Sequence, residues 1–415
     1  MRYITHIITF VVGFLILVGS YAQSSLKTNQ LTGGLNTITT AVPFLLITPD
    51  SRAGGMGDAG AATNPDANSI HWNVSKLAFA ESKMGFAVSY TPWLRALVPD
   101  INLAYLSGFY KLKKDQVVTG SLRYFSLGDI TFTDVVGNTI GQFRPNEFSI
   151  DLGYTRKLSD KFSGGMATRF IYSNLTGGID VLGAATHAGK SVAVDISATY
   201  RESKIKIADK KSILSVGLNI SNIGAKISYS TSAKRDFLPI NLRLGTALTI
   251  NVDDANSIAF AFDVNKLLVP TPPIYETDTA GAPVVDAAGN YKIKAGKSPN
   301  RGVPAGMIGS FADAPGGFKE ELREFNFAVG MEYWYDKQFA VRMGYFYEAP
   351  TKGNRKFFTL GAGVKYNVFG LDFAYLIPTR QRNPLENTLR FTLLFDFAAF
   401  KAQNEAESES GTPQK

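Results

Sequence analysis

Apolar and polar side chains alternate one by one along most of this chain, and that period restricts its fold more than any other feature. In residues 389–397 every odd position is Leu or Phe, while Arg390, Thr392 and Asp396 hold even positions. The same period runs through residues 325–335 and 148–154. Because neighbouring side chains of a β-strand point to opposite faces, each segment predicts a strand with one apolar and one largely polar face.

Two features favour a membrane barrel over a soluble β-sandwich, which also alternates. The alternating segments are about 10 to 12 residues long, as a tilted strand needs to be to cross a bilayer. Their apolar faces end in Tyr or Phe, and their polar faces are rich in Gly, Ala, Ser and isolated charges, as in a crowded barrel interior. Because hydrocarbon leaves no backbone group solvated, the sheet must close. The predicted fold is all-β, a 14-stranded antiparallel transmembrane β-barrel.

The predicted strands are even in number, which puts both ends of the chain on the same side of the membrane. Their ranges are 82–92, 101–112, 117–126, 147–158, 162–173, 191–202, 212–223, 239–251, 257–269, 324–336, 338–348, 356–367, 370–377 and 388–398. Connections after even-numbered strands are mostly short and rich in Lys, Asp and Asn, whereas those after odd-numbered strands are mostly longer. Because short turns of such barrels face the periplasm, both ends are predicted there.

The segments outside the strands predict the domain organisation. Arg2, an apolar run from Ile7 to Gly19, and small residues up to Ala22 indicate a cleaved signal peptide, since this run is too short to span a membrane. With no Cys in the chain, a lipidated cysteine and thiolate sites are excluded. The predicted parts are a signal peptide (1–22), a hatch or plug (23–81), the barrel (82–398) with a long extracellular loop (270–318), and a polar periplasmic tail (399–415). The hatch either folds into the lumen or caps the barrel from below.

The polar faces of the strands carry charges of both signs in equal number. They are Arg123, Asp151, Arg169, Asp195, Arg243, Asp263, Glu332, Arg342, Lys365, Asp372, Arg390 and Asp396. Packed together inside a closed barrel, we expect them to form ion pairs that rigidify the wall rather than to line a conduction pathway. The inward faces look polar and small.

The long loop holds seven of the 18 Pro and eight of the 39 Gly, which excludes a strand or a long helix there. We expect a loop without regular structure that contacts a partner. Apolar side chains on an outer loop need a partner or lipid to cover them. The predicted partner-binding residues are Trp93, Leu94 and Leu97 of the first loop, and Pro272, Pro273, Ile274, Tyr275, Phe311 and Phe318 of the long loop.

The sequence does not predict an enzyme, a cofactor or a metal site. A dinucleotide-type glycine pattern at 55–60 is followed too soon by Pro65 for the required helix, and a loosened phosphate-loop pattern at 184–191 precedes a strand. His71 and His187 are the only possible imidazole bases after the leader, and a structural role is expected for His71. The net charge of +8 comes from scattered Lys and Arg, so nucleic acid is not an expected partner.

The segment before the first strand carries a family resemblance. Its run 42–60 includes Asp50, Arg52, Gly54, Gly55, Met56, Gly57 and Asp58, and Asp66, Ala67, Asn68, Ser69, Trp72 and Asn73 follow. This pattern resembles the N-terminal signature of the PorV family, also called LptO, the outer-membrane shuttle component of the type IX secretion system. PorV proteins belong to a wider group similar to FadL, the long-chain fatty-acid transporter, whose fourteen-stranded barrel has an N-terminal hatch.

The resemblance implies a role in protein export. Such a protein would bind the C-terminal signal domain of cargo, dock beside the translocon barrel named SprA or Sov, and pass cargo to the surface attachment complex that contains the sortase PorU. It would sit in outer-membrane lipid and lipopolysaccharide. Two other functions stay open: a FadL-like transporter of hydrophobic small molecules, which needs an apolar lumenal pocket and a lateral opening, and a role in lipid A modification, for which the residues of a deacylase are absent.

Overall fold

The computed structural model describes residues 35–94, 98, 100–133, 136–178, 185–230, 235–279, 282–287, 289–379, 385–386 and 388–396. The chain divides into two compact units, Met1–Asn36 and Thr37–Lys415, and the fold given below is that of the second. The predicted signal peptide, the first part of the predicted hatch (23–34) and the predicted tail lie outside the described residues.

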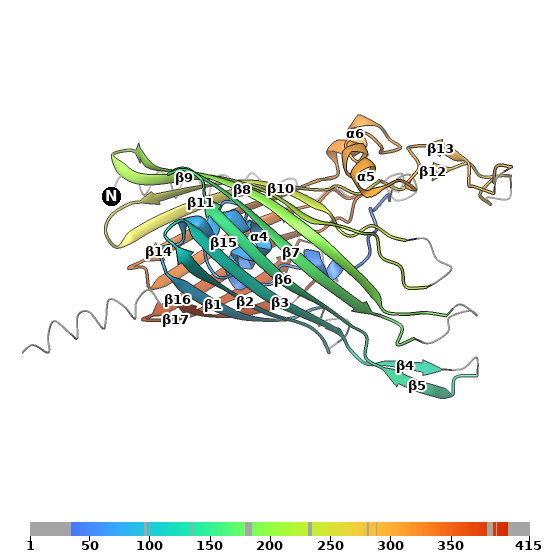
Figure 1. The fold of residues 1–415 in the computed structure, drawn as a ribbon, viewed down its shortest axis with the longest axis horizontal. Coiled ribbons are helices and arrows are strands. Elements are labelled where there is room, and N and C mark those ends of the chain that lie inside the picture. Colours follow the sequence, from blue (N-terminus) through green and yellow to red (C-terminus); the bar gives the residue numbers. More distant parts are fainter. Residues whose placement is uncertain are drawn as a thin grey trace, which may run out of the picture. The chain divides into compact units, whose positions relative to one another are not determined.

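Fourteen antiparallel strands form a closed barrel (Figure 1). In chain order they are β1 (Met84–Pro92), β2 (Ile101–Lys113), β3 (Gln116–Leu127), β6 (Asn146–Lys157), β7 (Phe162–Asn174), β8 (Gly189–Ile207), β9 (Lys210–Gly224), β10 (Asn241–Asn251), β11 (Asn256–Leu267), β14 (Phe325–Tyr335), β15 (Phe339–Tyr347), β16 (Lys356–Tyr366), β17 (Phe369–Pro378) and β18 (Leu389–Asp396). Each strand pairs with the next, and β1 pairs with β18 from Gly85 opposite Asp396 to Tyr90 opposite Phe391. Closure pairs the backbone groups that hydrocarbon would leave unsatisfied. The predicted fold class is confirmed, and each predicted strand overlaps one of these strands.

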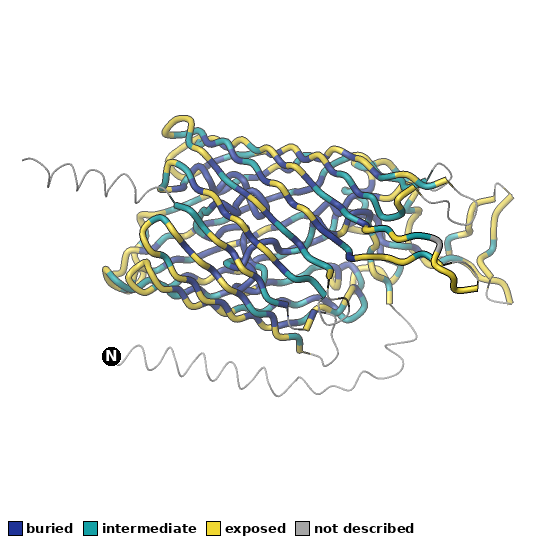
Figure 2. The backbone as a smooth tube through the Cα atoms, turned by 90° about the horizontal axis from the view of Figure 1, so that it is seen from below, coloured by how far each residue is buried: buried dark blue, intermediate teal, exposed yellow. Residues whose placement is uncertain are grey.

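The two faces of the wall differ in chemistry, and Figure 2 shows the alternation of exposed and buried residues along the strands. On β1, Phe86 and Tyr90 are exposed, while Ala87 and Ser89 between them are buried. The exposed residues of the other strands are again mostly Leu, Val, Ile, Phe and Tyr. The outer surface is therefore an apolar belt of the kind that faces lipid.

No helix among the described residues is long and apolar enough to cross a membrane.

The two ends of the barrel carry connections of different length. This agrees with the short connections predicted after even-numbered strands and the longer ones predicted after odd-numbered strands. At one end short turns join β2 to β3, β6 to β7, β8 to β9, β10 to β11, β14 to β15 and β16 to β17. The other connections lie at the opposite end, on the right in Figure 1, and include the ribbon of β4 (Ile130–Thr133) and β5 (Thr139–Phe143). We call these the short-turn end and the long-loop end, and in an outer-membrane barrel they face the periplasm and the exterior.

The connection between β11 and β14 contains regular structure, so the expectation of a structureless loop is wrong. It holds β12 (Ile274–Tyr275), β13 (Ile293–Ala295), α5 (Val303–Gly309) and α6 (Phe318–Leu322). Pro304 lies in the first turn of α5, where its missing N–H removes no helical hydrogen bond. Glu321 of α6 accepts hydrogen bonds from the N–H groups of Asp313 and Ala314, at 2.6 and 2.8 Å. Short helices therefore form here despite the Pro and Gly content.

Residues 37–80 pack against the inner face of the wall. They form η1 (Pro43–Leu46), α3 (Ser51–Gly55), α4 (Ser69–Trp72) and η2 (Val74–Phe79), and Figure 1 shows α4 enclosed by strands. The N–H of Ser51 donates to Thr392 Oγ1 of β18 at 2.9 Å, and the hydroxyl of Ser163 of β7 donates to the carbonyl of Ser75 at 2.8 Å. The sequence left open whether this segment folds into the lumen or caps the barrel from below. These contacts with inward-facing side chains are the ones expected for a segment inside the lumen. We call residues 37–80 the lumenal segment.

Introducing a charge on the outer face of the wall tests whether the apolar belt faces lipid. Leu152 projects outward from the middle of β6 and is 67% exposed, whereas Leu158, 61% exposed, lies in the short turn after β6. We expect Leu152→Arg to destabilise the barrel in lipid vesicles by about 2–4 kcal/mol, because the charge must enter hydrocarbon. Leu158→Arg is the matched control, with little expected effect. Equal urea midpoints for the two variants would contradict a lipid-facing β6.

Candidate functional site

The signature that resembles PorV includes the N-terminus of α3, where Asp50 joins two parts of the lumenal segment. Its carboxylate accepts a hydrogen bond from the N–H of Ala53 at 2.9 Å, which caps the helix, and another from Trp72 Nε1 at 2.6 Å. Burial, together with the nearby charge of Asp66, raises the pKa of Asp50 to about 6. Asp50 therefore fixes α3 relative to α4.

Arg52 connects the lumenal segment to the wall through a buried ion-pair network. Its guanidinium donates to both carboxylate oxygens of Glu332 of β14, at 2.9 and 2.8 Å, and to Asp66 at 2.9 Å. Arg342 of β15 donates to the same Glu332 at 2.7 Å and to Asp372 of β17 at 2.8 Å. Removal of any one of these side chains would leave a buried charge unpaired. Breaking such a network lowers the free energy of unfolding by about 3–5 kcal/mol.

The glycines of the signature allow its backbone to touch the strands. Gly57 has φ +69°, and its N–H donates to Thr359 Oγ1 of β16 at 2.8 Å. A Cβ at Gly57 would lie 2.6 Å from the backbone nitrogen of Tyr345, and one at Gly55 would lie 3.1 Å from the Cα of Gly361. Met56 between them is 1% exposed. A side chain at Gly57 would therefore push the segment off the wall.

Other inward charges bind backbone groups of the lumenal segment. Asp263 of β11 accepts hydrogen bonds from the N–H groups of Gly60 and Ala61, both at 2.8 Å. Arg123 of β3 donates to the carbonyl oxygens of Phe44 and Leu45, at 3.2 and 2.7 Å. The wall thus supplies acceptors and donors to a segment with little secondary structure of its own.

The expectation that the inward charges form ion pairs is confirmed for part of the set. Arg169 of β7 donates to Asp151 of β6 at 2.7 Å and to Asp195 of β8 at 3.1 Å. The sequence did not indicate that others, such as Asp263 and Arg123, would bind the lumenal segment, because that depends on which strands lie beside it. Lys365 and Asp396 are only half-buried, since they lie near the short-turn end.

His71 has a structural environment, as expected. Its Nδ1 accepts a hydrogen bond from Arg123 Nη2 at 2.6 Å, and burial, with Arg123 adding to it, lowers the pKa of His71 well below its usual value. His187 is exposed. Across the described residues, no group of three His, Asp or Glu side chains is placed to hold a metal ion.

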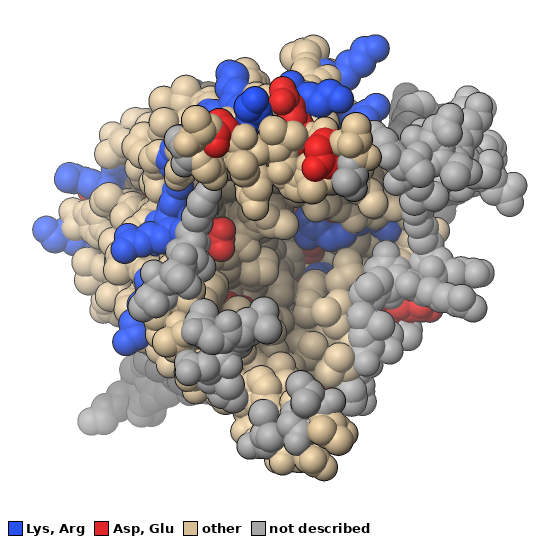
Figure 3. Space-filling view, turned by 90° about the vertical axis from the view of Figure 1, so that its right-hand side faces the viewer, with Lys and Arg blue, Asp and Glu red and all other residues tan. Residues whose placement is uncertain are grey.

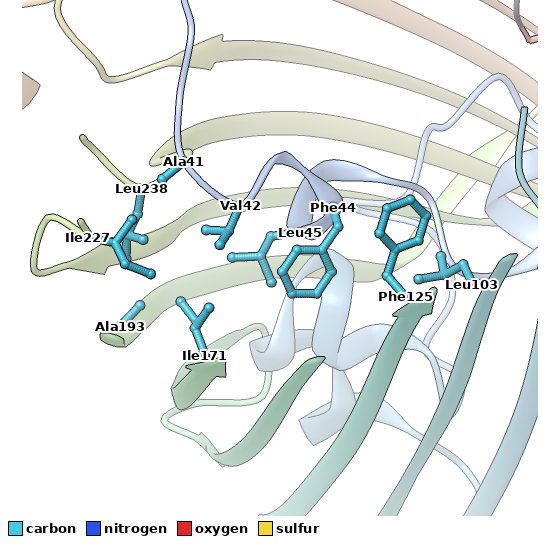
Figure 4. Close-up of a cluster of buried hydrophobic side chains, with 10 residues drawn as sticks. All are labelled: Ala41, Val42, Phe44, Leu45, Leu103, Phe125, Ile171, Ala193, Ile227 and Leu238. Carbon is cyan, nitrogen blue, oxygen red and sulfur yellow. The ribbon is translucent and has the colours of Figure 1, made fainter. Parts of the chain in front are cut away.

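An apolar cluster fills the lumen toward the long-loop end, so the expectation that inward faces are polar and small is wrong there. Figure 4 shows Val42, Phe44 and Leu45 of the lumenal segment against side chains of several strands. Phe44 stacks on Phe125 of β3 with ring centroids 6.2 Å apart. Ile171 of β7 is fully buried in the same cluster. Large inward side chains occur where the lumenal segment provides apolar contacts for them.

A cavity of about 400 Å³ lies beside this cluster, between residues 37–48 and the long-loop ends of β11, β14, β16, β17 and β18. Figure 3 shows the hollow of this end, with basic side chains deep inside. Two basic residues of its lining are held by carboxylates: Lys352 lies 3.0 Å from Glu324, and Arg355 lies 2.9 Å from Glu348. The lining also contains Asp58 and Arg390, and its remaining side chains are apolar or small and polar.

The predicted partner-binding residues fall into two groups. Ile274, Phe311 and Phe318 are exposed, at 52, 47 and 75%. The remaining described members are less accessible: Pro272, Tyr275, Trp93 and Leu94 are half-buried, and Pro273 is buried. The expected exposure of Trp93 and Leu94 is wrong, because both pack against apolar clusters of the barrel interior. Leu97 lies outside the described residues.

Several exposed apolar residues of the long connection were missed, and two of them lie on its helices. Ile308 of α5 is 78% exposed, and Leu322 of α6 is 52% exposed. Leu322 follows Phe318 by four residues, which puts both on one face of a helix. A 3.6-residue period over 318–322 could have identified this face, but the surrounding Pro and Gly hid so short a helix.

Comparison with known proteins gives one family. A family model described as "Type IX secretion system protein PorV" matches residues 30–274. No curated protein matches the chain. Among solved structures, the toluene transporter TodX of Pseudomonas putida is 10% identical, with 87% of this chain and 98% of that chain covered and a TM-score of 0.43. A FadL homologue of Pseudomonas aeruginosa is also 10% identical, with 88 and 100% covered and a TM-score of 0.41.

The contact of Gly57 with the wall can be tested against a matched glycine. Gly289 also has a positive φ, of +77°, but nothing lies within 4 Å of its missing Cβ. Both substitutions to Ala carry the backbone strain, and only Gly57→Ala adds the clash, for which we expect a further loss of about 1–3 kcal/mol. Amide hydrogen exchange of residues 50–61 should accelerate in Gly57→Ala and stay unchanged in Gly289→Ala. Unchanged exchange in both would contradict the close packing.

Proposed function

We propose a function from the premise that the chain belongs to the PorV family of type IX secretion system proteins. It is an outer-membrane component of that system, in keeping with its closed barrel and apolar belt. We propose that it acts as a docking barrel: the long-loop end binds the C-terminal signal domain of cargo, and the lipid-facing wall contacts a translocon barrel of the SprA or Sov type. It then passes the cargo to the attachment complex that contains a PorU-type sortase.

The filled lumen is the observation that carries this proposal. The lumenal segment bonds to β3, β11, β14, β16 and β18, so the segment contacts strands on several sides of the barrel. A folded cargo domain has no room beside it. Cargo must therefore bind at the end or the outer face of this barrel, and a separate channel must conduct it.

The long-loop end supplies a surface suited to another protein. Ile274, Ile308, Phe311, Phe318 and Leu322 are all exposed on the connection between β11 and β14. Exposed apolar side chains that gather on one connection are typical of sites covered by a partner. The same connection is held to the barrel by buried ion pairs, including Lys266 with Glu324 at 2.5 Å, so these side chains are presented from a fixed base.

The alternative is a FadL-like transporter of hydrophobic small molecules. The cavity at the long-loop end favours it, because apolar side chains such as Ile47, Phe357 and Leu376 contribute to the lining. Transport also needs a path past the lumenal segment or through the wall, and the described strands pair around the whole ring. The family match favours export over uptake.

The apolar surface can be tested by removing side chains that the barrel does not use. We expect the double variant Ile308→Ser and Phe318→Ser to reduce the release of many secreted proteins several-fold, because cargo or translocon binding loses its apolar contacts. Secreted proteins are quantified by mass spectrometry of the culture medium, and the folded barrel is checked by its heat-modifiable migration on gels. Val136→Ser, at a residue 80% exposed after β4, is the control and should leave secretion unchanged.

Affinity purification of the tagged protein separates export from uptake. We expect a very large barrel and C-terminal signal domains to co-purify with the native chain, and less of one of them with the double variant. A normal secretome with failure of growth on a fatty acid after gene deletion would support the transporter instead. Purification without any co-purifying protein, together with normal secretion by the double variant, would reject the docking role.

A further inference from the structure

Three neighbouring turns at the short-turn end carry an excess of positive charge. They join β2 to β3, β6 to β7 and β8 to β9, and these six strands are consecutive in the barrel. We call them the basic arc, which consists of residues 111–115, 156–161 and 201–211. The arc contains eleven Lys or Arg and four Asp or Glu. The other turns of this end contain two Lys and three Asp, in residues 252–256, 336–338 and 365–368.

The carboxylates of the basic arc do not neutralise its charge. Three of the four are already paired: Asp115 with Arg156 at 3.5 Å, Asp160 with Lys157 at 3.5 Å, and Glu202 with Lys161. Six further lysines are exposed and form no ion pair in the part of the chain that the structure describes. They are Lys113, Lys114, Lys204, Lys206, Lys210 and Lys211. The arc therefore presents free ammonium groups to the solution.

Two of these lysines face each other across the β8–β9 hairpin, which lies at the short-turn end in Figure 1. Lys206 is directly opposite Lys211 in the register of the two strands. Like charges in this cross-strand position repel each other and destabilise a hairpin. Lys211 shares its face of β9 with Ser215 and Asn219, which are buried in the barrel, so both lysines project on the axis side. An anionic group bound between them would remove the repulsion.

The membrane surface does not supply this anion. Exposed aromatic side chains, including Tyr110, Tyr154 and Tyr200, mark the membrane interface on these strands. Lys206 follows Tyr200 by six residues, which is about 20 Å along a strand. At a strand tilt of about 40° this is roughly 15 Å beyond the interface, and the headgroup layer is only about 5–8 Å thick. The facing lysines therefore meet an aqueous partner.

The extent of the basic arc suits an extended peptide. Six neighbouring strands spaced by about 4.8 Å span roughly 24 Å. An extended chain covers this distance with about seven residues. A lysine ends in a compact ammonium on a flexible stem, which can reach carboxylates at different places along such a segment. A segment rich in Asp or Glu therefore complements the arc in both charge and length.

We propose that the basic arc binds an acidic, extended segment of a periplasmic protein, with Lys206 and Lys211 as its main contact. Carboxylates of the segment supply the counter-charges that the arc lacks. The surface goes beyond the proposed function and does not rest on it, because it lies at the opposite end of the barrel from the exposed apolar residues of the long connection. It gives the barrel a second partner, on the periplasmic side.

The test uses the full-length barrel in nanodiscs of phosphatidylcholine and an N-terminally fluorescent decapeptide of Glu and Gly. Fluorescence anisotropy compares this peptide with the same peptide carrying Gln in place of Glu. We expect the Glu peptide to bind at least about tenfold more tightly at low salt, and the difference to shrink as salt screens the charges. Lys206→Gln with Lys211→Gln should weaken its binding about fivefold, as loss of two exposed charge contacts predicts. Lys206→Arg with Lys211→Arg should preserve binding.

Lys337→Gln with Lys365→Gln is the matched control, because it removes the same charge from the other side of the same end. This variant should bind the Glu peptide like the unchanged protein. Loss of the facing lysines relieves a repulsion, so we expect the first double variant to fold, and heat-modifiable migration checks both. Equal binding of the Glu and Gln peptides, or equal weakening by the two double variants, would overturn the site.

Two other occupants have outcomes of their own. Tighter binding of the Glu peptide by the full-length variant Glu405→Gln, Glu407→Gln and Glu409→Gln would identify the chain's own tail as the occupant and overturn the external partner. Absence of peptide binding, with phosphatidylglycerol enriched over phosphatidylcholine among co-purified lipids only when Lys206 and Lys211 are present, would make this a lipid site. The proposed export role would survive each of these results, because it is measured by secretion and co-purification.

Discussion

Backbone hydrogen bonding in hydrocarbon is the constraint on which this structure depends. A strand in a bilayer has no water to bond its N–H and C=O groups, so each strand must be paired on both sides. Pairing of β1 with β18 meets this requirement and converts the period-two pattern into an inside and an outside. The outside becomes an apolar belt. The inside must then satisfy the polar side chains that closure has buried.

The lumenal segment and the wall provide hydrogen-bond and ion-pair partners for one another. Glu332 and Asp263 accept hydrogen bonds from Arg52 and from the N–H groups of Gly60 and Ala61. The segment has little regular structure, and the wall supplies partners for backbone groups that a helix or a sheet would pair internally. Removal of either side would leave buried charges without partners, which explains why the contacts concentrate on a few side chains of both signs.

Because the lumenal segment fills the lumen, we expect the binding surfaces of the protein at the ends and the outer face of the barrel. The long-loop end combines exposed apolar side chains such as Phe318 with a cavity of about 400 Å³. Both are properties of a surface that receives another molecule, and they lie on the side where an outer-membrane barrel meets the exterior. A docking role is the function that we propose for a barrel that is closed, filled and open to contacts at this end.

The sequence by itself determined the strands, their number and which face of each strand points to lipid. The period of two assigns side chains to the two faces whichever strand is the neighbour, and a sheet in lipid has to close. Its resemblance to the PorV signature also marked 50–58 as a special segment. It could not show that Arg123 binds Phe44 and Leu45, that Trp93 turns inward, or that Arg390 pairs with Asp58. These features depend on which residues, far apart in the sequence, face each other across the lumen. Only the closed barrel brings them together.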